Sequence, residues 1–191
     1  MKRIAVFASG NGSNCENLIR YFLDSDVARV ALVVSNRSDA RVLERAAQLG
    51  CPSVVIVGKE LRTDEGVLEL LRHYRIDLIV LAGFLLMIPD YLLEAYPRRI
   101  LNIHPSLLPK FGGSGMWGRH VHEAVREAGE QETGMTVHYV SAVCDGGEII
   151  AQYATPLLPD DTASDIAQKV HVLEMQYFPL VVEEVVKSLS I

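Results

Sequence analysis

Residues 100–109 read Ile100-Leu101-Asn102-Ile103-His104-Pro105-Ser106-Leu107-Leu108-Pro109, an apolar run that ends in two polar side chains. Residues two apart on a strand point to the same face, so an extended segment 100–104 places Asn102 and His104 side by side. Pro105 favours an extended His104 and ends regular strand pairing. A carboxamide and an imidazole then lie at the end of a strand, where ligands bind in open α/β sheets. A polar strand end that only leads into a proline-rich turn fits the same spacing.

The segments on either side of this stretch alternate between strand and helix patterns. Continuous apolar runs, typical of parallel strands covered on both faces, occupy residues 4–8, 30–34, 53–57 and 77–82. Helical periodicity is found over residues 15–23, 40–49, 63–74 and 89–95, and again from His122 onward. This alternation predicts an α/β fold with a doubly wound, mostly parallel sheet in one domain spanning residues 1–191. Residues 134–140 and 148–155 predict antiparallel strands near the carboxyl-terminal edge.

The composition is that of an ordinary acidic globular protein. Hydrophobic residues make up 49% of the chain, and the net charge is -6 with a pI near 5.5. Because binding a phosphate backbone requires clustered Lys and Arg, nucleic acid is not expected as a partner. Cys15, Cys51 and Cys144 follow neither a metal-binding nor a disulfide spacing, which favours a reducing, cytoplasmic location. The longest apolar run, 78–88, is too short to span a bilayer, so no membrane partner is expected.

The segment Ser9–Asn14 lies between the first predicted strand and a predicted helix. Its sequence, Ser-Gly-Asn-Gly-Ser-Asn, has two glycines that allow a tight turn and close approach of a ligand to the backbone. Unpaired N–H groups at the start of the helix suit a phosphate, and Ser13 and Asn14 can add side-chain donors. A dinucleotide is not indicated, because the third glycine and an acidic residue after the second strand are missing. The segment predicts a monophosphate site, with a glycine turn before a capped helix as the alternative.

Four motifs, in order along the chain, resemble those of the folate-dependent formyltransferases. They are Ser9-Gly10-Asn11-Gly12-Ser13-Asn14, Leu81-Ala82-Gly83-Phe84, Asn102-Ile103-His104-Pro105-Ser106-Leu107-Leu108-Pro109 and Asp145-Gly146-Gly147. The resemblance implies a Rossmann-like fold and an enzyme that uses 10-formyltetrahydrofolate. Within the family, the motifs are most similar to those of enzymes that formylate the amine of 5-phosphoribosylglycinamide in purine biosynthesis. Folate is then a co-substrate, and neither a tightly bound cofactor nor a metal is expected.

The resemblance implies that Asn102, His104 and Asp145 are the catalytic residues. The carboxamide of Asn102 can donate a hydrogen bond to the oxyanion that develops on the formyl group. His104 titrates near neutrality and can donate or shuttle a proton to the leaving folate nitrogen. A neighbouring Asp145 is expected to raise the pKa of His104 and to favour its charged form. Without the resemblance, an aspartate beside two glycines is more typical of a structural turn.

The resemblance also assigns residues to the two substrates. Phosphoribosylglycinamide is expected to contact Gly12, Ser13, Asn14, His171 and Glu174, with Glu174 holding the amine. Folate is expected to contact Leu85, Leu86, Met87, Ile88, Asn102, Ser141, Ala142, Val143, Cys144 and Asp145. Two of these sets have ordinary alternatives, because residues 85–88 are also typical of core packing and a helical His–Glu pair is usually solvated.

The glycine-rich segment Gly112–Arg119 predicts a mobile loop that closes over the substrates. The corresponding link is shorter in the commonest form of the family, so no contacts are carried over to it. Met116 and Trp117 supply apolar area for covering a ligand. His120 and His122 diverge on a helix and have no third ligand near them, so they do not predict a metal site.

The first and last helices carry more specific predictions. The first is expected to bury Leu18, Ile19, Phe22 and Leu23 on one side. The last is expected to begin with a capping box of Thr162 and Asp165. Its buried stripe is expected to contain Ile166, Val170, Leu173 and Tyr177, and Pro179 is expected to kink or break it.

Two other functions fit the same motifs. A related enzyme could transfer the formyl group to methionyl-tRNA or to water, but the tRNA enzyme should carry a further carboxyl-terminal domain and the deformylase an amino-terminal regulatory domain. A non-catalytic folate- or nucleotide-binding module is the alternative from another class, and the joint presence of Asn102, His104 and Asp145 argues against it. The expected partners are small-molecule substrates, with the chain as a monomer or homodimer.

Overall fold

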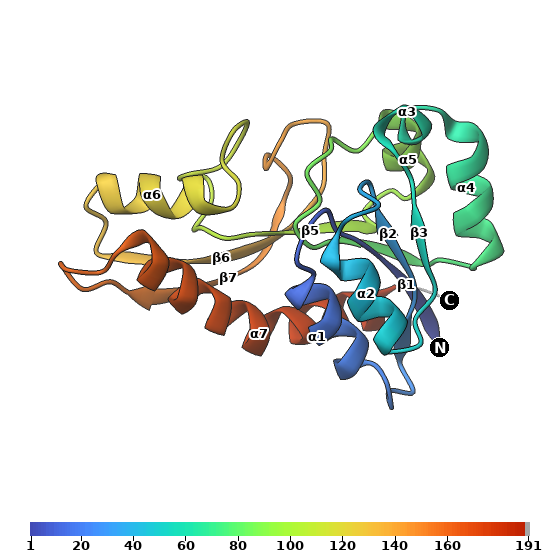
Figure 1. Cartoon of the computed structure of the whole chain (residues 1–191), viewed down its shortest axis with the longest axis horizontal. Helices are drawn as coiled ribbons and strands as arrows, with labels where there is room; N and C mark the ends of the chain where they lie inside the picture. Colours follow the sequence, from blue (N-terminus) through green and yellow to red (C-terminus); the bar gives the residue numbers. More distant parts are fainter. Residues whose placement is uncertain (190–191) are drawn as a thin grey trace.

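The computed structural model describes residues 1–189, so the last two residues of the expected domain lie outside the described range. The strands of this range form a seven-stranded sheet in the order β3-β2-β1-β4-β5-β6-β7 (Figure 1). They are β1 (Lys2–Phe7), β2 (Ala28–Ser35), β3 (Ser53–Val55), β4 (Leu78–Leu81), β5 (Ile100–His104), β6 (Glu132–Tyr139) and β7 (Ile149–Pro156). The first five strands are parallel, whereas β6 is antiparallel to both β5 and β7. The predicted sheet, with antiparallel strands at its carboxyl-terminal edge, is therefore confirmed.

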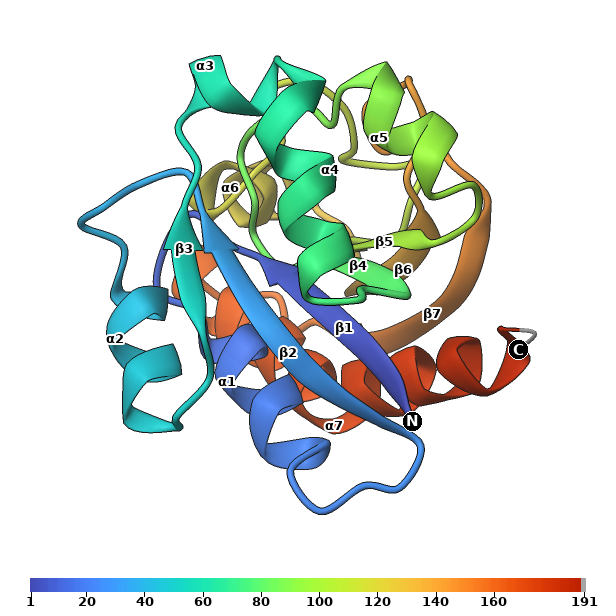
Figure 2. The same ribbon diagram turned by 90° about the vertical axis from the view of Figure 1, so that its right-hand side faces the viewer.

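Helices cover both faces of the sheet. They are α1 (Ser13–Tyr21), α2 (Arg41–Gln48), α3 (Gly58–Leu61), α4 (Asp64–His73), α5 (Asp90–Ala95), α6 (Arg119–Glu127) and α7 (Ala163–Ser188). Figures 1 and 2 show α4 and α5 on one side of the parallel strands, with α1 and α7 on the other. No helix within residues 1–189 is long and apolar enough to cross a membrane.

The second half of strand β1, residues 4–7, shows why a parallel strand can be apolar at successive positions. Ile4 and Val6 belong to the apolar cluster shared with α1, α2 and α7. Ala5 and Phe7, which point to the other face, belong to the cluster shared with α3, α4 and α5. Because both faces of the strand are covered, an alternating pattern would place polar side chains in the core.

Three local predictions differ from the structure. The run at 53–57 is a strand only over Ser53–Val55, and the short helix α3 was not predicted. Leu23 was expected to be buried but is 67% exposed, because α1 ends at Tyr21 and the following turn directs this side chain to solvent. Pro179 was expected to kink or break the last helix, and the break is contradicted, since α7 continues through Pro179 to Ser188.

A side chain from α1 compensates for the proline in α7. Proline has no N–H to donate to the carbonyl four residues earlier, which here belongs to Met175. That carbonyl instead accepts a hydrogen bond of 2.9 Å from the Asn17 amide nitrogen. Pro179 itself is buried, and packing of the surrounding helix face further stabilises the continuous helix. The capping box of Thr162 and Asp165 is present as predicted.

Candidate active site

The carboxyl ends of β1, β4 and β5 open onto a cleft of about 560 Å³. This is the edge at which open α/β sheets bind ligands. Its walls come from the glycine loop after β1, the loop after β4, the end of β5, residues 113–118 and the loop between β6 and β7. Helices α6 and α7 contribute His122 and Glu174.

The three residues predicted to be catalytic meet in this cleft. Asn102 and His104 lie two apart on β5, and Asp145 comes from the β6–β7 loop with a left-handed backbone, φ 53°. One Asp145 carboxylate oxygen, Oδ2, lies 3.5 Å from Nδ1 of His104. The other, Oδ1, accepts a long hydrogen bond of 3.4 Å from Asn102 Nδ2. Two motifs more than forty residues apart in the sequence therefore form one polar cluster.

The Asp145 carboxylate is held in its ionised form. The backbone N–H of Gly113 donates to Oδ2 over 2.8 Å. Burial alone raises the pKa of this carboxyl, but contacts with His138, Gly113 and His104 outweigh burial and lower the pKa below its ordinary value. The cluster therefore contains a fixed negative charge at neutral pH.

The pKa of His104 is lowered although the Asp145 carboxylate lies beside it. Its side chain is 4% exposed, and burial lowers its pKa below the ordinary 6.5 even though Asp145 raises it. The predicted direction of the Asp145 contribution is correct, but burial is the larger influence on the pKa of His104. The ring is therefore predominantly neutral at pH 7.

The neutral ring of His104 has a defined tautomer. Nε2 lies 2.7 Å from the carbonyl oxygen of Phe111, which can only accept a hydrogen bond. The proton therefore lies on Nε2, and Nδ1 faces Asp145. With this N–H held by the backbone of residues 111–113, His104 can reach a ligand only after that backbone moves.

The glycine loop is built as a helix start with free N–H groups. Gly12 is the N-cap of α1 with φ 74°, and a Cβ at this position would lie 2.5 Å from Val42 of α2. The first helical hydrogen bond runs from the Glu16 N–H to the Gly12 carbonyl, so the N–H groups before it have no helical acceptor. Arg45 donates to the backbone and side-chain oxygens of Asn11 and thereby fixes the loop.

Asn14 and Glu174 connect this loop to α7. The amide nitrogen of Asn14 donates to Glu174 over 2.9 Å, and since a carboxylate can only accept, the amide orientation is determined. The amide oxygen of Asn14 is buried without a hydrogen-bond partner in the described part of the chain. His171 lies 3.5 Å from the same carboxylate, and its hydrogen bond with Glu174 raises its pKa. Glu174 lines the cleft, whereas His171 is half-exposed outside the lining.

The expected folate residues line an apolar extension of the cleft. A smaller cavity of about 80 Å³ lies between residues 86–88, Val140, Ser141 and the stretch 143–145, and it shares Asn102 with the main cleft. Leu85 and Met87 are 50% and 55% exposed, so core packing does not explain them, although Ile88 is buried. Ala142 lines neither cavity, and the Ser141 hydroxyl is hydrogen-bonded within its own loop.

Two buried histidines were not predicted as part of this site. His138 lies beside Asn102 and Asp145, and His122 lines the cleft with an unpartnered Nδ1 among the described residues. The alternation of residues 134–140 puts Thr136 and His138 on one face of β6, which is the sequence signal for His138. What the pattern does not contain is the register of β6 against β5, which pairs His138 with Asn102.

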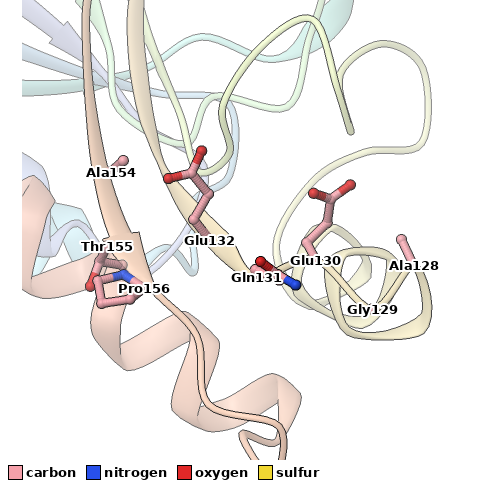
Figure 3. A pocket seen from close by; sticks show the side chains of 8 residues that line it. All are labelled: Ala128, Gly129, Glu130, Gln131, Glu132, Ala154, Thr155 and Pro156. Atoms are coloured by element: carbon pink, nitrogen blue, oxygen red, sulfur yellow. The ribbon is translucent and has the colours of Figure 1, made fainter.

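Another large cleft lies elsewhere and has a different lining. Figure 3 shows it between the end of α6 and the strands β6 and β7, with the carboxylates of Glu130 and Glu132. Glu130 pairs with Lys110 over 2.9 Å. None of the predicted site residues lines this cleft. Among residues 1–189, no group of three or more His, Cys, Asp or Glu is placed to hold a metal ion.

Known proteins are similar to this chain over most of its length. A family model described as formyl transferase matches residues 2–182. The chain is 40% identical to a phosphoribosylglycinamide formyltransferase of Bacillus subtilis, over 96% of this chain and 94% of that protein. It is 43% identical to a trifunctional purine biosynthetic protein of Drosophila pseudoobscura, over 93% of this chain but 13% of that much longer protein. The crystal structure of a phosphoribosylglycinamide formyltransferase from Anaplasma phagocytophilum has a TM-score of 0.90 and 35% identity, covering 98% of this chain and 87% of that chain.

Proposed function

This chain belongs to the formyl transferase family, and we propose that it transfers the formyl group of 10-formyltetrahydrofolate to the amine of 5-phosphoribosylglycinamide in purine biosynthesis. The products are formylglycinamide ribonucleotide and tetrahydrofolate. Folate is a co-substrate here, with no tightly bound cofactor. The Bacillus and Anaplasma proteins, which are similar over nearly the whole chain, are named for this reaction.

One observation carries the proposal. Asn102, His104 and Asp145 line a cleft that contains both a glycine loop with free N–H groups and an apolar extension. The first feature suits a phosphate and the second suits the flat ring system of a folate. An acceptor and a donor bound in these two parts would meet at the polar cluster.

The reaction needs an oxyanion donor and a route for one proton. The neutral amine attacks the formyl carbon, its nitrogen becomes positively charged, and the formyl oxygen becomes an oxyanion. A hydrogen bond from the Asn102 amide to that oxygen is worth roughly 3 kcal/mol in comparable sites. Collapse of the intermediate breaks the bond to the folate nitrogen, which must gain a proton as the amine loses one.

A neutral His104 suits the role of proton shuttle better than that of a stored acid. Once the ring proton has moved from Nε2 to Nδ1, beside Asp145, the freed Nε2 can accept the proton released by the amine nitrogen and pass one to the departing folate nitrogen, as the lowered pKa allows. The Asp145 carboxylate, 3.5 Å away, stabilises the imidazolium formed between these two transfers. No net proton is consumed, so the reaction does not require His104 to be charged beforehand.

The remaining site residues are assigned to binding. The start of α1, at Gly12, Ser13 and Asn14, binds the substrate phosphate. His171, whose hydrogen bond with Glu174 raises its pKa and favours its charged form, is assigned to the same substrate. Glu174, fixed by Asn14, accepts from the substrate amine. Residues 85–88 and 141–145 contact the folate.

The test is a comparison of acceptors. The purified protein is incubated with 10-formyltetrahydrofolate and phosphoribosylglycinamide, methionyl-tRNA or no acceptor, and release of tetrahydrofolate is followed by absorbance. We expect release with phosphoribosylglycinamide only, and a rate lower by about two to three orders of magnitude for the matched variant Asn102→Ala. Equal release without an acceptor would identify a hydrolase, and folate binding without release would identify a binding module.

A further inference from the structure

His138 contacts the predicted catalytic residues although no motif includes it. It lies on β6, paired across the sheet with Asn102 of β5, and is 2% exposed. Its Nε2 lies 3.0 Å from Asn102 Nδ2, and its Nδ1 lies 2.9 Å from the carbonyl oxygen of Tyr139. Both ring nitrogens are therefore within hydrogen-bond distance of a partner.

The protons in this group can be assigned from the chemistry of its members. The Asp145 carboxylate, which accepts from the Gly113 N–H, can only accept when ionised, so the Asn102 atom that faces it at 3.4 Å is the amide nitrogen. The same nitrogen faces His138 Nε2, which must then accept and carries no proton. The ring proton then lies on Nδ1, which donates it to the Tyr139 carbonyl. These three hydrogen bonds are satisfied by this one arrangement. The remaining approach, 3.6 Å between His138 Nε2 and Asp145 Oδ1, is too long for a hydrogen bond.

We propose that His138 is a positioning residue that orients the carboxamide of Asn102 for formyl transfer. This inference rests on the function proposed above. His138 holds one amide hydrogen of Asn102 at 3.0 Å, so the second is directed toward Asp145, where the contact of 3.4 Å is weak enough to be exchanged for the formyl oxygen. If the carboxamide were turned over, its oxygen would face the Nε2 lone pair and the Asp145 carboxylate, and the oxyanion would have no donor.

Gly147 supplies the space that this arrangement needs. A Cβ at Gly147 would lie 1.7 Å from the Tyr139 carbonyl oxygen, which is the acceptor for His138. The motif Asp145-Gly146-Gly147 therefore serves the cluster twice, because it provides the carboxylate that orients Asn102 and leaves room for the carbonyl that fixes the His138 tautomer.

The first test measures the tautomer directly in the unmodified protein. Long-range ¹H–¹⁵N NMR correlations of the histidine rings distinguish Nδ1–H, Nε2–H and doubly protonated forms. We expect His138 in the Nδ1–H form at neutral pH. An Nε2–H or doubly protonated ring would overturn the proposal, and this result does not depend on which acceptor the enzyme uses.

The second test compares two substitutions in the formyl-transfer assay. His138→Leu removes the acceptor, whereas His138→Gln keeps an acceptor oxygen near the position of Nε2. We expect His138→Leu to lower kcat by about 30-fold or more with KM values changed by less than about threefold, and His138→Gln to restore kcat to within about fivefold of the wild type. In an Asn102→Ala background, His138→Leu should have no further effect, because the group that it orients is absent. Multiplicative losses in the double variant, or equal losses for Leu and Gln, would overturn the proposal.

If the wild type fails to formylate phosphoribosylglycinamide, the proposed function fails, and the tautomer measurement still decides the orientation of Asn102.

Discussion

The charge on His104 depends on two opposing influences within a few ångströms. Burial disfavours the imidazolium, and the Asp145 carboxylate favours it, with burial the stronger. A shuttle histidine benefits from this balance, because a ring that is neutral before the reaction can accept the proton that the amine must lose.

Replacing Asp145 by Asn should lower the pKa of His104 further, because the stabilising anion is removed while burial remains. NMR titration of the His104 ring in both proteins measures the change. The matched control is Glu148→Gln, since Glu148 pairs with Arg98 on the surface and should leave the His104 pKa unchanged. A His104 pKa that stays the same or rises in Asp145→Asn would exclude the assigned role of Asp145.

Ser13 offers a cleaner test of phosphate binding than Gly12. A side chain at Gly12 would clash with Val42, so any effect there would include misfolding. Ser13→Asp adds a negative charge at a helix start, where Asp is compatible with folding, but it should repel a phosphate and raise the KM for phosphoribosylglycinamide by about 10-fold or more. Steady-state kinetics should show an unchanged KM for folate and a near-normal phosphoribosylglycinamide KM for the neutral variant Ser13→Asn. Equal effects of Asp and Asn on both substrates would rule out a phosphate at this helix.

At the scale of elements, a hydrogen bond from Asn17 of α1 to the Met175 carbonyl of α7 replaces the helical bond that Pro179 cannot donate. Asn17→Ala should lower the free energy of unfolding by about 1 kcal/mol, because the Met175 carbonyl loses its donor. Urea denaturation measures this cost. In a Pro179→Ala background the backbone N–H of residue 179 can supply the bond, so Asn17→Ala should then cost much less. The same cost in both backgrounds would show that Asn17 acts through something other than the proline gap.

The segment 112–119 has to move before His104 can act. The His104 N–H is donated to Phe111, and the Gly113 N–H is donated to Asp145, so residues 111–113 occupy polar groups that the reaction needs. Met116 and Trp117 line the same cleft, and Trp117 is 51% exposed and packs edge-on against His120 at 5.4 Å between ring centroids. These contacts favour the prediction that the segment is a lid that rearranges when substrates bind.

Trp117 is the single tryptophan of the chain, so its fluorescence reports on this segment alone. We expect its emission to shift, and acrylamide quenching to fall, when phosphoribosylglycinamide and a non-reactive folate analogue are added together. The expected cause is transfer of the indole from water to the ligand surface. Either ligand alone serves as the control. Unchanged emission and quenching with both ligands saturating would mean that the segment is not a ligand-gated lid.

For the whole molecule, buried histidines link stability to pH. Burial lowers the pKa values of His104 and His122 below the ordinary 6.5 that they regain on unfolding. Between the folded and unfolded pKa values the unfolded chain binds more protons, so the free energy of unfolding should fall as the pH drops below about 6.5. His171 opposes this trend, because its raised pKa adds stability below 6.5 that is lost as the pH rises through its folded value.

Urea denaturation at several pH values between 7.5 and 5 measures the sum of these effects. We expect a net loss of stability toward acid, since two buried rings oppose one half-exposed ring. In His122→Gln one of the two buried titrations is removed, so the dependence on pH should be shallower. A steeper or unchanged dependence in that variant would contradict the assignment of His122 as a buried neutral histidine.

The sequence alone determined the order of the strands, the order of the helices other than α3, and the positions of the chemically active motifs. Apolar runs such as residues 4–8 and 77–82 are local patterns, and each predicts its own element without reference to the rest of the chain. The motif around Asn102 and His104 likewise specifies a strand end, because side-chain alternation and the effect of proline act over neighbouring residues. The α/β fold and the polar pair at its centre could therefore be predicted from the sequence.

Tertiary structure decided how those elements modify one another. The lowered pKa of His104 depends on burial by distant segments, and the continuity of α7 depends on a side chain 158 residues away from Met175. The pairing of His138 with Asn102 depends on strand register across the sheet, which no pattern within either strand contains. These properties arise from contacts between residues far apart in the sequence. The direction of the His104 pKa shift, for example, is set by distances and burial that exist only in the folded chain.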